Sequence, residues 1–133
     1  MIYVESEIKD TSPHKSNIEK IFYFAPVDKV VLYETGMNLV RVYDAGTMQI
    51  EKSITCVGDI LALEYIEEFH AMAVSLSDRT IIFFDIQNKN NKIVRKLHVP
   101  STQKCLTYIS KKQVLFSAGV DGAIFAWNMN KLF

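Results

Sequence analysis

The sequence predicts an all-β fold made of three copies of one four-stranded antiparallel unit. The first observation is a repeat, because three fourteen-residue segments align without a gap at residues 31–44, 72–85 and 115–128. The second is its period, since the last residues of these segments, Asp44, Asp85 and Asn128, are 41 and 43 residues apart. A period of about 40–45 residues is typical of the blades of a β-propeller. The third is an apolar strand pattern that opens every copy.

The opening strand of each copy has apolar residues two apart, which places them on one side of a strand. A shift of 41 residues aligns Phe22 with Leu63 and Phe24 with Tyr65. We therefore predict opening strands at residues 21–25, 61–66 and 105–109, each followed by a turn at residues 26–29, 67–70 and 110–113.

Two further strands and a polar fourth strand complete the predicted unit. The second and third strands are joined by tight turns at residues 36–38, 77–79 and 120–122, and the third strands are continuously apolar, as expected between two neighbouring sheets. The fourth strands, at residues 49–54 and 93–98, carry the charges that protect an exposed sheet edge from pairing with other chains.

The last copy resembles the WD-repeat family of β-propellers. The resemblance rests on the segment from Ser117 through Asp121 and Gly122 to Trp127 and Asn128, and it extends over residues 18–133. The resemblance implies that Asp78 and Asp121 make the turn between the second and third strands. Asp suits such a turn because its carboxylate accepts local backbone N–H bonds. The first copy departs from the pattern, because Met37 stands at this position.

The resemblance also implies two sets of residues. One is a structural set of turn aspartates and of aromatic residues that pack between sheets: Asp78, Asp121, Tyr43, Phe84 and Trp127. The other is a partner-binding set beside the turns and the loops that enter each unit: Asn38, Asp59, Ser77, Arg79, Lys104, Val120 and Gly122. In this family the corresponding face commonly binds peptides and other proteins.

Composition and motifs limit the function classes. Lys plus Arg and Asp plus Glu are both 15, which argues against general electrostatic binding to nucleic acid or to an anionic membrane. We read no catalytic constellation, no metal-ligand spacing around the three histidines and no cofactor motif, so we expect a protein that is not an enzyme. Cys56 and Cys105 lie in apolar stretches, so we expect buried, reduced thiols and a cytoplasmic setting.

The predicted organisation is a leading outer strand and loop at residues 1–17, with three units at residues 18–54, 55–98 and 99–133. The strand prediction for the first part rests on Ile2, Tyr3 and Val4. Propellers have about four to eight blades, so three units form an arc that is incomplete on its own. The missing blades would come from the same longer chain, from another chain in an assembly, or from a second copy in a homodimer.

The predicted function is therefore a non-catalytic scaffold for protein–protein interactions within a larger complex. Residues 115–127 are also similar to WD-repeat proteins of cilia and flagella, which implies a microtubule-associated structural component of the axoneme. The alternative is a soluble adaptor that recognises peptides in ubiquitin ligation or signalling. A propeller enzyme has no support beyond the variety of functions that one fold can host.

Overall fold

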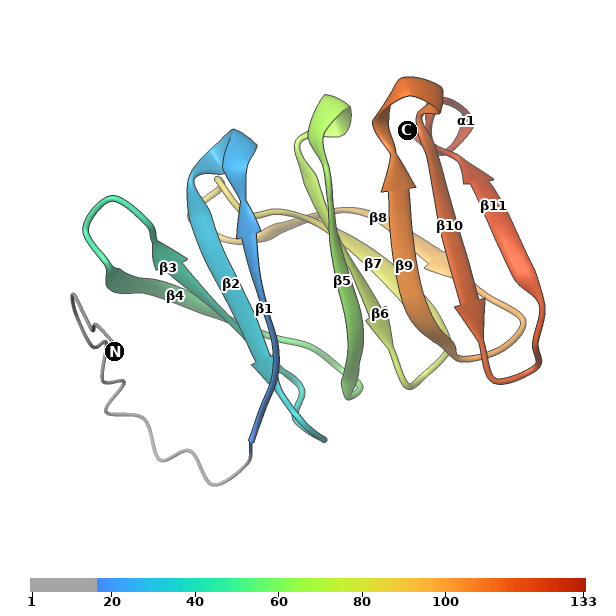
Figure 1. The fold of residues 1–133 in the computed structure, drawn as a ribbon, viewed down its shortest axis with the longest axis horizontal. Helices are drawn as coiled ribbons and strands as arrows, with labels where there is room; N and C mark the ends of the chain where they lie inside the picture. Colours follow the sequence, from blue (N-terminus) through green and yellow to red (C-terminus); the bar gives the residue numbers. More distant parts are fainter. Residues whose placement is uncertain (1–16) are drawn as a thin grey trace, which may run out of the picture.

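The protein is seen in a computed structural model, which describes residues 17–133. Three antiparallel sheets stand side by side in an open arc, with their innermost strands nearest the viewer in Figure 1. The outer strand predicted near Ile2 to Val4 lies outside the described residues. No helix in residues 17–133 is long and apolar enough to cross a membrane.

The three sheets repeat one strand order from the inside of the arc outward. The first contains β1 (Ile18–Phe24), β2 (Lys29–Glu34), β3 (Leu39–Asp44) and β4 (Gln49–Thr55). The second contains β5 (Ile60–Ile66), β6 (Ala71–Leu76), β7 (Thr80–Asp85) and β8 (Lys92–His98). The third contains only β9 (Gln103–Ile109), β10 (Val114–Gly119) and β11 (Ile124–Asn128), followed by helix α1 (Met129–Leu132).

The turn after each innermost strand is a short 3-10 helix, and all three have the same geometry. These turns are η1 (Ala25–Val27), η2 (Glu67–Phe69) and η3 (Ser110–Lys112). Each ends on a residue in the left-handed conformation, with φ of 52° at Asp28, 51° at His70 and 52° at Gln113. The backbone thus repeats even where the sequence does not, since none of the three is the glycine that this conformation favours.

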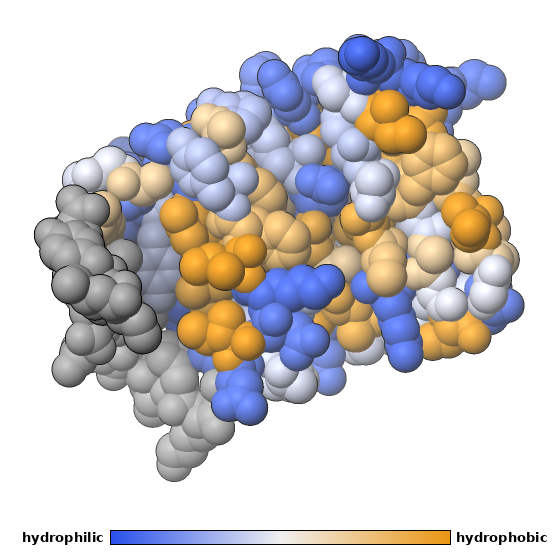
Figure 2. All heavy atoms as spheres, in the orientation of Figure 1, coloured by the Kyte–Doolittle hydropathy of each residue, from blue (hydrophilic) through white to orange (hydrophobic). Residues whose placement is uncertain are grey.

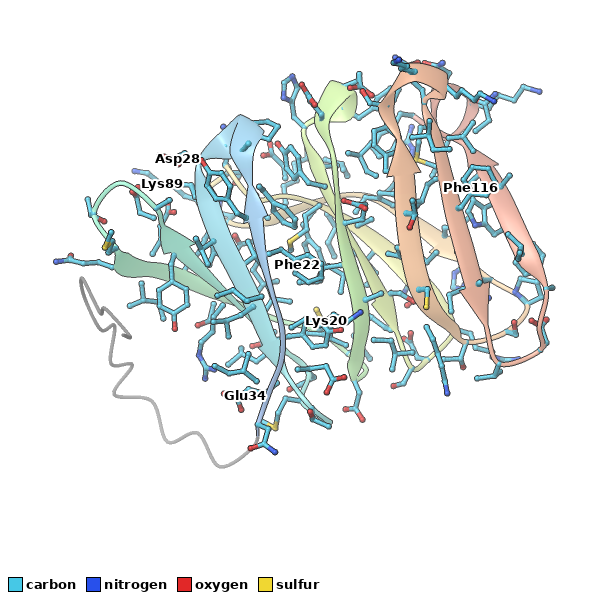
Figure 3. The ribbon with its side chains drawn as sticks, viewed as in Figure 1. Lys20, Phe22, Asp28, Glu34, Lys89 and Phe116 are labelled. Atoms are coloured by element: carbon cyan, nitrogen blue, oxygen red, sulfur yellow. The ribbon has the colours of Figure 1, made fainter. Side chains whose placement is uncertain are left out.

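The alignment of the first unit is wrong by one residue in its first two strands. Four residues connect β2 to β3, whereas three connect β6 to β7, so β1 and β2 match β5 and β6 at a shift of 42. Ile21, not Phe22, therefore corresponds to Leu63. A one-residue shift moves every side chain to the other face of a strand. Phe22 consequently points from β1 toward the second sheet, where it packs against the first core (Figure 3).

Two hydrophobic cores fill the spaces between the sheets. The core between the first and second sheets contains Phe24 stacked on Tyr65, with their ring centroids 5.3 Å apart. The core between the second and third sheets extends to the C-terminal residues, because Phe133 stacks on Phe69 at 4.8 Å and meets Phe83 edge-on at 5.3 Å. The second sheet is therefore covered on both faces.

The outer faces of the first and third sheets carry exposed apolar side chains. On the first sheet, Ile21 and Tyr23 are 64% and 59% exposed, and apolar atoms lie along β1 in Figure 2. On the third sheet, Phe116 and Ile124 lie on the side away from the second sheet (Figure 3). Exposed apolar side chains therefore lie on both outer faces of the described arc, although Leu32 and Tyr43 on the outer face of the first sheet are buried.

The burial predicted for one cysteine is also wrong. Cys56 is buried and Cys105 is exposed, and both thiols are free. Cys105 corresponds to the buried Ala62, but it lies on the outer face of the third sheet, which has no neighbouring sheet. Cys105 is exposed because no sheet covers this face among the described residues, although apolar residues lie beside it in the sequence.

Candidate partner-binding edge

Turns and entry loops from all three sheets gather at one edge of the arc. This turn edge consists of residues 35–38, 56–59, 77–79, 99–102 and 120–123, and it lies at the bottom of Figure 1. Every residue of the predicted partner-binding set is on this edge except Lys104, which is the second residue of β9 and lies two residues after the edge. The structure therefore brings together positions that are up to 84 residues apart in the sequence, from Asn38 to Gly122.

Backbone hydrogen bonds hold each turn of this edge to the entry loop of its own sheet. The N–H groups of Thr35, Ser77 and Val120 donate to the carbonyls of Asn17, Asp59 and Thr102 over 2.9, 2.9 and 3.2 Å. A second set ties each turn to the start of the loop that leads to the next sheet, because the N–H groups of Cys56 and Val99 donate to the carbonyls of Asn38 and Arg79 over 2.7 and 3.1 Å. These bonds fix the backbone and leave side chains at the tips for contacts with a partner.

Three of the predicted partner-binding residues also support the loops. The Asn38 amide donates to the carbonyl of Cys56 over 2.9 Å, so this half-buried side chain ties the first turn to the next entry loop. The Ser77 hydroxyl accepts the N–H of Asp59 over 2.9 Å. Asp59 and Ser77 remain exposed, whereas Asn38 is half-buried and its amide is bonded within the loop.

The other predicted residues point outward at the tips. Arg79, Lys104 and Val120 are exposed, with Val120 at 62%. Gly122 has φ of +77° and open space around its missing side chain, so its role in the turn is conformational. Arg79 corresponds to Gly122 and adopts the same left-handed conformation, with φ of 65°. The edge thus presents a strained cation at the second turn.

The two turn aspartates have different partners. Asp121 accepts the backbone N–H of Ala123 over 3.0 Å, which is the local bond expected for a turn aspartate. Asp78 instead accepts the side-chain hydroxyl of Thr80 over 2.5 Å. The threonine that follows Asp78 provides a donor that the alanine after Gly122 lacks, so the same acidic position stabilises its turn in two ways.

Sequence reasoning missed two exposed apolar residues on the turn edge. Val57 is 82% exposed in the entry loop of the second sheet, and Met37 is exposed in the first turn. With Val120 they place an exposed apolar side chain on the first turn, the entry loop of the second sheet and the last turn of the edge. The available signal was a valine between Cys56 and Gly58, in a short polar loop that does not continue the strand pattern.

The predicted aromatic set lies at one strand position but in different surroundings. Phe84 is buried in the first core, and Tyr43 is buried on the outer side of the first sheet. Trp127 is half-buried against the second sheet, where its indole N–H donates to the Ser117 hydroxyl over 2.8 Å. Phe125 stacks on Trp127 on this same inner side, so neither ring lies on the outer face of the third sheet.

Polar contacts at the opposite edge join the second sheet to the third. Glu68 accepts the hydroxyls of Tyr108 and Ser110, the latter over 2.7 Å, and these bonds hold the pKa of Glu68 below its usual value. Glu68 thus contacts the next sheet, whereas Lys111 and Lys112 of η3 are exposed.

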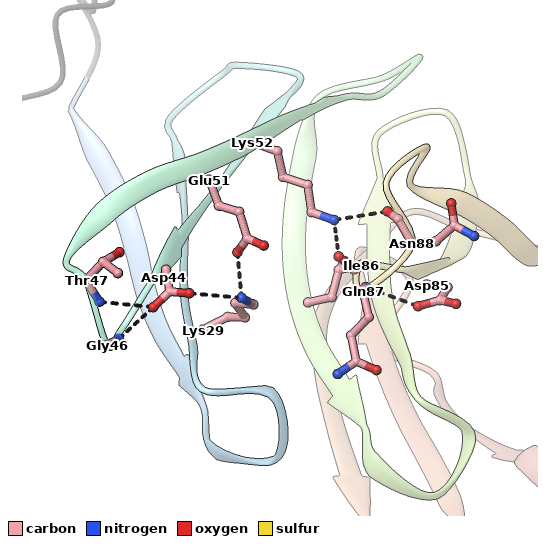
Figure 4. A network of polar contacts seen from close by, with 10 residues as sticks. All are labelled: Lys29, Asp44, Gly46, Thr47, Glu51, Lys52, Asp85, Ile86, Gln87 and Asn88. Atoms are coloured by element: carbon pink, nitrogen blue, oxygen red, sulfur yellow. Dashed lines mark hydrogen bonds and ion pairs between the residues drawn. The ribbon is translucent and has the colours of Figure 1, made fainter.

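A lysine joins the first sheet to the second on the outer side of the arc (Figure 4). The Lys52 ammonium, on β4, donates to the carbonyls of Ile86 and Asn88, the second over 3.1 Å. Burial lowers the pKa of this lysine. Arg95, on β8, lies 43 residues later and donates to the carbonyl of Leu132 over 2.8 Å. At each of the two junctions between consecutive sheets, a cation on the outermost strand therefore donates to a carbonyl of the next unit.

Two observations describe the metal-binding and nucleophilic groups of the described residues. Residues 17–133 contain no group of three His, Cys, Asp or Glu residues placed to hold a metal ion. The Cys56 thiol is buried, and burial raises its pKa to about 11, so it is protonated near neutral pH and is a poor nucleophile.

Comparison with known proteins supports the fold. No family model matches the chain. Among solved structures, the chain is similar to a chain of a structure described as the crystal structure of a mitotic checkpoint complex, with a TM-score of 0.75 and 16% identity over 94% of the present chain. The present chain spans 37% of the length of that chain. It is thus an all-β, propeller-type arc of three sheets.

This fold is common, so it does not assign a function by itself. In all, 607 chains of solved structures match significantly. Folds shared this widely host many functions, and function has to be argued from the site. A function can be inferred from the turn edge, from the exposed apolar side chains on the two outer faces, and from the edge of β11, which has no partner strand within residues 17–133.

Proposed function

We propose that this chain is a non-catalytic WD-repeat-type scaffold that binds other proteins at its turn edge. In this proposal the arc is one part of a larger propeller and works within a multiprotein assembly. The observation that carries the proposal is the row of exposed apolar side chains, Met37, Val57 and Val120, on loops that repeated backbone hydrogen bonds hold in place. Exposed apolar groups on a rigid base can bind with little loss of conformational entropy.

Charge gives this edge its specificity. Asp59, Asp78 and Arg79 are exposed on the turn edge and Lys104 is exposed at the start of β9, so this edge carries both acidic and basic groups. Such an arrangement selects partners by charge complementarity more than it raises affinity. We expect the partner to be an extended protein segment with apolar side chains and mixed charge. Nucleic acid and membranes are not expected partners, since the chain has no net charge.

The edge is tested by exchanging its apolar tips for polar ones. We expect Val57→Ser together with Val120→Ser to move the protein from a large native complex toward smaller species in sedimentation of cell extracts. Ile93→Ser is the matched control, because Ile93 is 54% exposed on β8 but lies outside the turn edge. A wild-type protein that sediments as a single 15.2 kDa species would contradict the proposal.

Two cellular settings agree with such a scaffold. One is a structural component of the ciliary axoneme, and the other is a soluble cytoplasmic adaptor that recognises peptides. The support for the axoneme is the resemblance of residues 115–127, while a multiprotein complex as structural neighbour agrees with either setting. Salt-resistant association with microtubules in fractionation favours the axoneme, and a soluble pool that binds phosphopeptides favours the adaptor.

A further inference from the structure

The third sheet has an unpaired strand edge within the described part of the chain. β3 pairs with β4 and β7 pairs with β8, whereas β11 pairs with β10 alone. The corresponding side chains also differ in exposure, because Val40 and Ile81 are 0% exposed, while Ile124 is 73% exposed and has neither a fourth strand nor a following sheet beside it among the described residues. A fourth strand on β11 would restore the hydrogen bonding and begin to cover this isoleucine.

The two fourth strands present in the chain have the same length and register. β4 and β8 each contain seven residues, and both have a bulge at their third residue. Their second residues are Ile50 and Ile93, which pair with the last aromatic residue of the neighbouring strand. The two strands share branched aliphatic residues at positions two and six and a cation at position four: Ile50, Ile93, Ile54, Leu97, Lys52 and Arg95.

Positions six and four have distinct physical roles in these strands. Position six pairs with Val40 in the first sheet and Ile81 in the second, and its side chain joins the core shared with the next sheet. Position four is the cation that donates to a carbonyl of the next sheet, as Lys52 and Arg95 do. Alternation places both side chains on the face that the following sheet covers.

We propose that the free edge of β11 is occupied by an antiparallel seven-residue strand with branched aliphatic residues at positions two and six and Lys or Arg at position four. This inference rests on the proposed function, in which the arc is part of a larger propeller. The bulge leaves position six opposite Ile124 and position four opposite Ala126. The cation of this strand then points away from the second sheet, toward carbonyls of a further sheet.

The first residues of this chain do not match the proposed occupant. A strand that starts at Met1 has Ile2 at position two, but Val4 stands at position four and Ser6 at position six. Moving the frame by one or two residues does not place a cation at position four, because the first lysine is Lys9. The pattern therefore points to a strand from another segment rather than to the exchange of residues 1–8 between two copies.

The proposed strand can be tested by appending a copy of the β8 sequence to the C-terminus of the chain. Met129 is buried like Ile86, 43 residues earlier, so the chain after β11 begins as the loop between β7 and β8 does. At this spacing, the counterpart of Lys92 falls two residues after Phe133. A copy of residues 91–98 appended directly to Phe133 therefore places a β8 sequence where the fourth strand of the third sheet would begin.

The readout is amide hydrogen exchange in β11 of the full chain with and without the graft. We expect the graft to slow exchange of the outward-pointing amides of β11 at least tenfold. In a second graft the copies of Lys96 and Leu97 swap places, which moves the aliphatic side chain to the other face of the strand. This graft should slow amide exchange in β11 by less than a third as much as the first graft does. A third graft replaces its copy of Arg95 with Gln and should protect as well as the first.

Each outcome separates the proposed pattern from the proposed function. Equal protection by the exchanged graft shows an open edge without the proposed pattern, and it overturns this inference while leaving the larger propeller intact. Loss of protection in the Gln graft places the cation's contact within the third sheet and also overturns the inference. If β11 of the ungrafted chain is already fully protected, the open arc fails, and with it the proposed function.

Discussion

The second and third sheets share one strand pattern but differ in their surroundings. The strands of the third sheet align with those of the second sheet at a shift of 43 residues, both in the sequence alignment and in the observed strands. Among the described residues, the second sheet has four strands and a neighbouring sheet on each face, while the third has three strands and one neighbouring sheet. As a result Ile81 is fully buried and Ile124 is largely exposed, although both are isoleucines at the same position.

This difference shows that burial in a propeller is decided by the neighbouring sheet. The sequence of each unit specifies its strands and turns, and the stacking of units specifies which side chains leave water. A unit at the end of an arc therefore keeps a core sequence on its surface. Such a surface is an interaction site for the next sheet and an aggregation hazard without one.

The largest effect should separate the two equivalent isoleucines. We expect Ile81→Ala to lower the free energy of unfolding by about 2–5 kcal/mol, because it leaves a cavity between two sheets. Ile124→Ala should change it by less than about 0.5 kcal/mol, since the side chain is exposed. Chemical denaturation of the two variants measures both, and equal losses would mean that Ile124 is covered in solution.

The cations that join the sheets should also differ. Lys52→Met leaves two carbonyls of the second sheet without a charged donor, and we expect a loss of about 1.5–3 kcal/mol in unfolding free energy. Arg95→Met removes an exposed contact with Leu132, so its cost should be about 0–1 kcal/mol. Denaturation of both variants checks this order, and a larger cost for Arg95 would contradict it.

Two glutamates between the second and third sheets should respond to pH in opposite directions. Burial raises the pKa of Glu64, so its charged form is disfavoured in the fold and stability falls as pH rises from the ordinary carboxyl pKa through the raised one. Hydrogen bonds from Tyr108 and Ser110 lower the pKa of Glu68, so its contribution is present above the ordinary value and is lost as pH falls through the lowered one.

These signs are measured by thermal unfolding of Glu64→Gln and Glu68→Gln across acidic pH. Relative to wild type, the Glu64 variant should gain most at neutral pH, and the Glu68 variant should lose most there. The two difference curves should converge toward low pH, where both wild-type carboxyls are protonated. Curves of the same sign would show that one of the two environments is assigned incorrectly.

The smallest effect concerns the equivalent turn residues Arg79 and Gly122. Both are left-handed, but only glycine adopts this conformation without strain. Glycine relieves the strain of this conformation but adds conformational entropy to the unfolded chain, which offsets part of the gain. We therefore expect Arg79→Gly to stabilise the protein by about 0.5–1 kcal/mol and Gly122→Ala to destabilise it by a similar amount. Thermal unfolding of the two variants is the check, and a destabilised glycine variant would show that the Arg79 side chain supports the fold.

Most of the fold was predictable because it depends on local pattern. The period, the opening strands and the charged outer strands follow from residue spacing, and the three-sheet arc confirms them. The register of β1 was not predictable from an alignment without gaps, since one extra residue between β2 and β3 moves Phe22 to the other face. The exposure of Cys105 depends on whether another sheet packs on the outer face of the third sheet, and the residues around Cys105 in the sequence do not indicate this.

The candidate site was predictable in position more than in detail. Turn residues such as Ser77 and Val120 follow from the repeat, so their place on one edge could be inferred. Val57 could not be selected by family position, because its significance lies in exposure on a rigid loop. The contacts of Lys52 with carbonyls 34 and 36 residues away were also hidden, since they exist only when two sheets are stacked. Whether the predicted residues bind a partner stays a prediction.

The central claim is that the third sheet ends the arc with an open strand edge. Its most direct test compares amide exchange in β7 and β11 of the chain at a concentration where it is a single monomeric species. We predict that the outward-pointing amides of β11 exchange at least tenfold faster than the corresponding amides of β7. Equal protection of the two strands in the monomer would contradict the open arc.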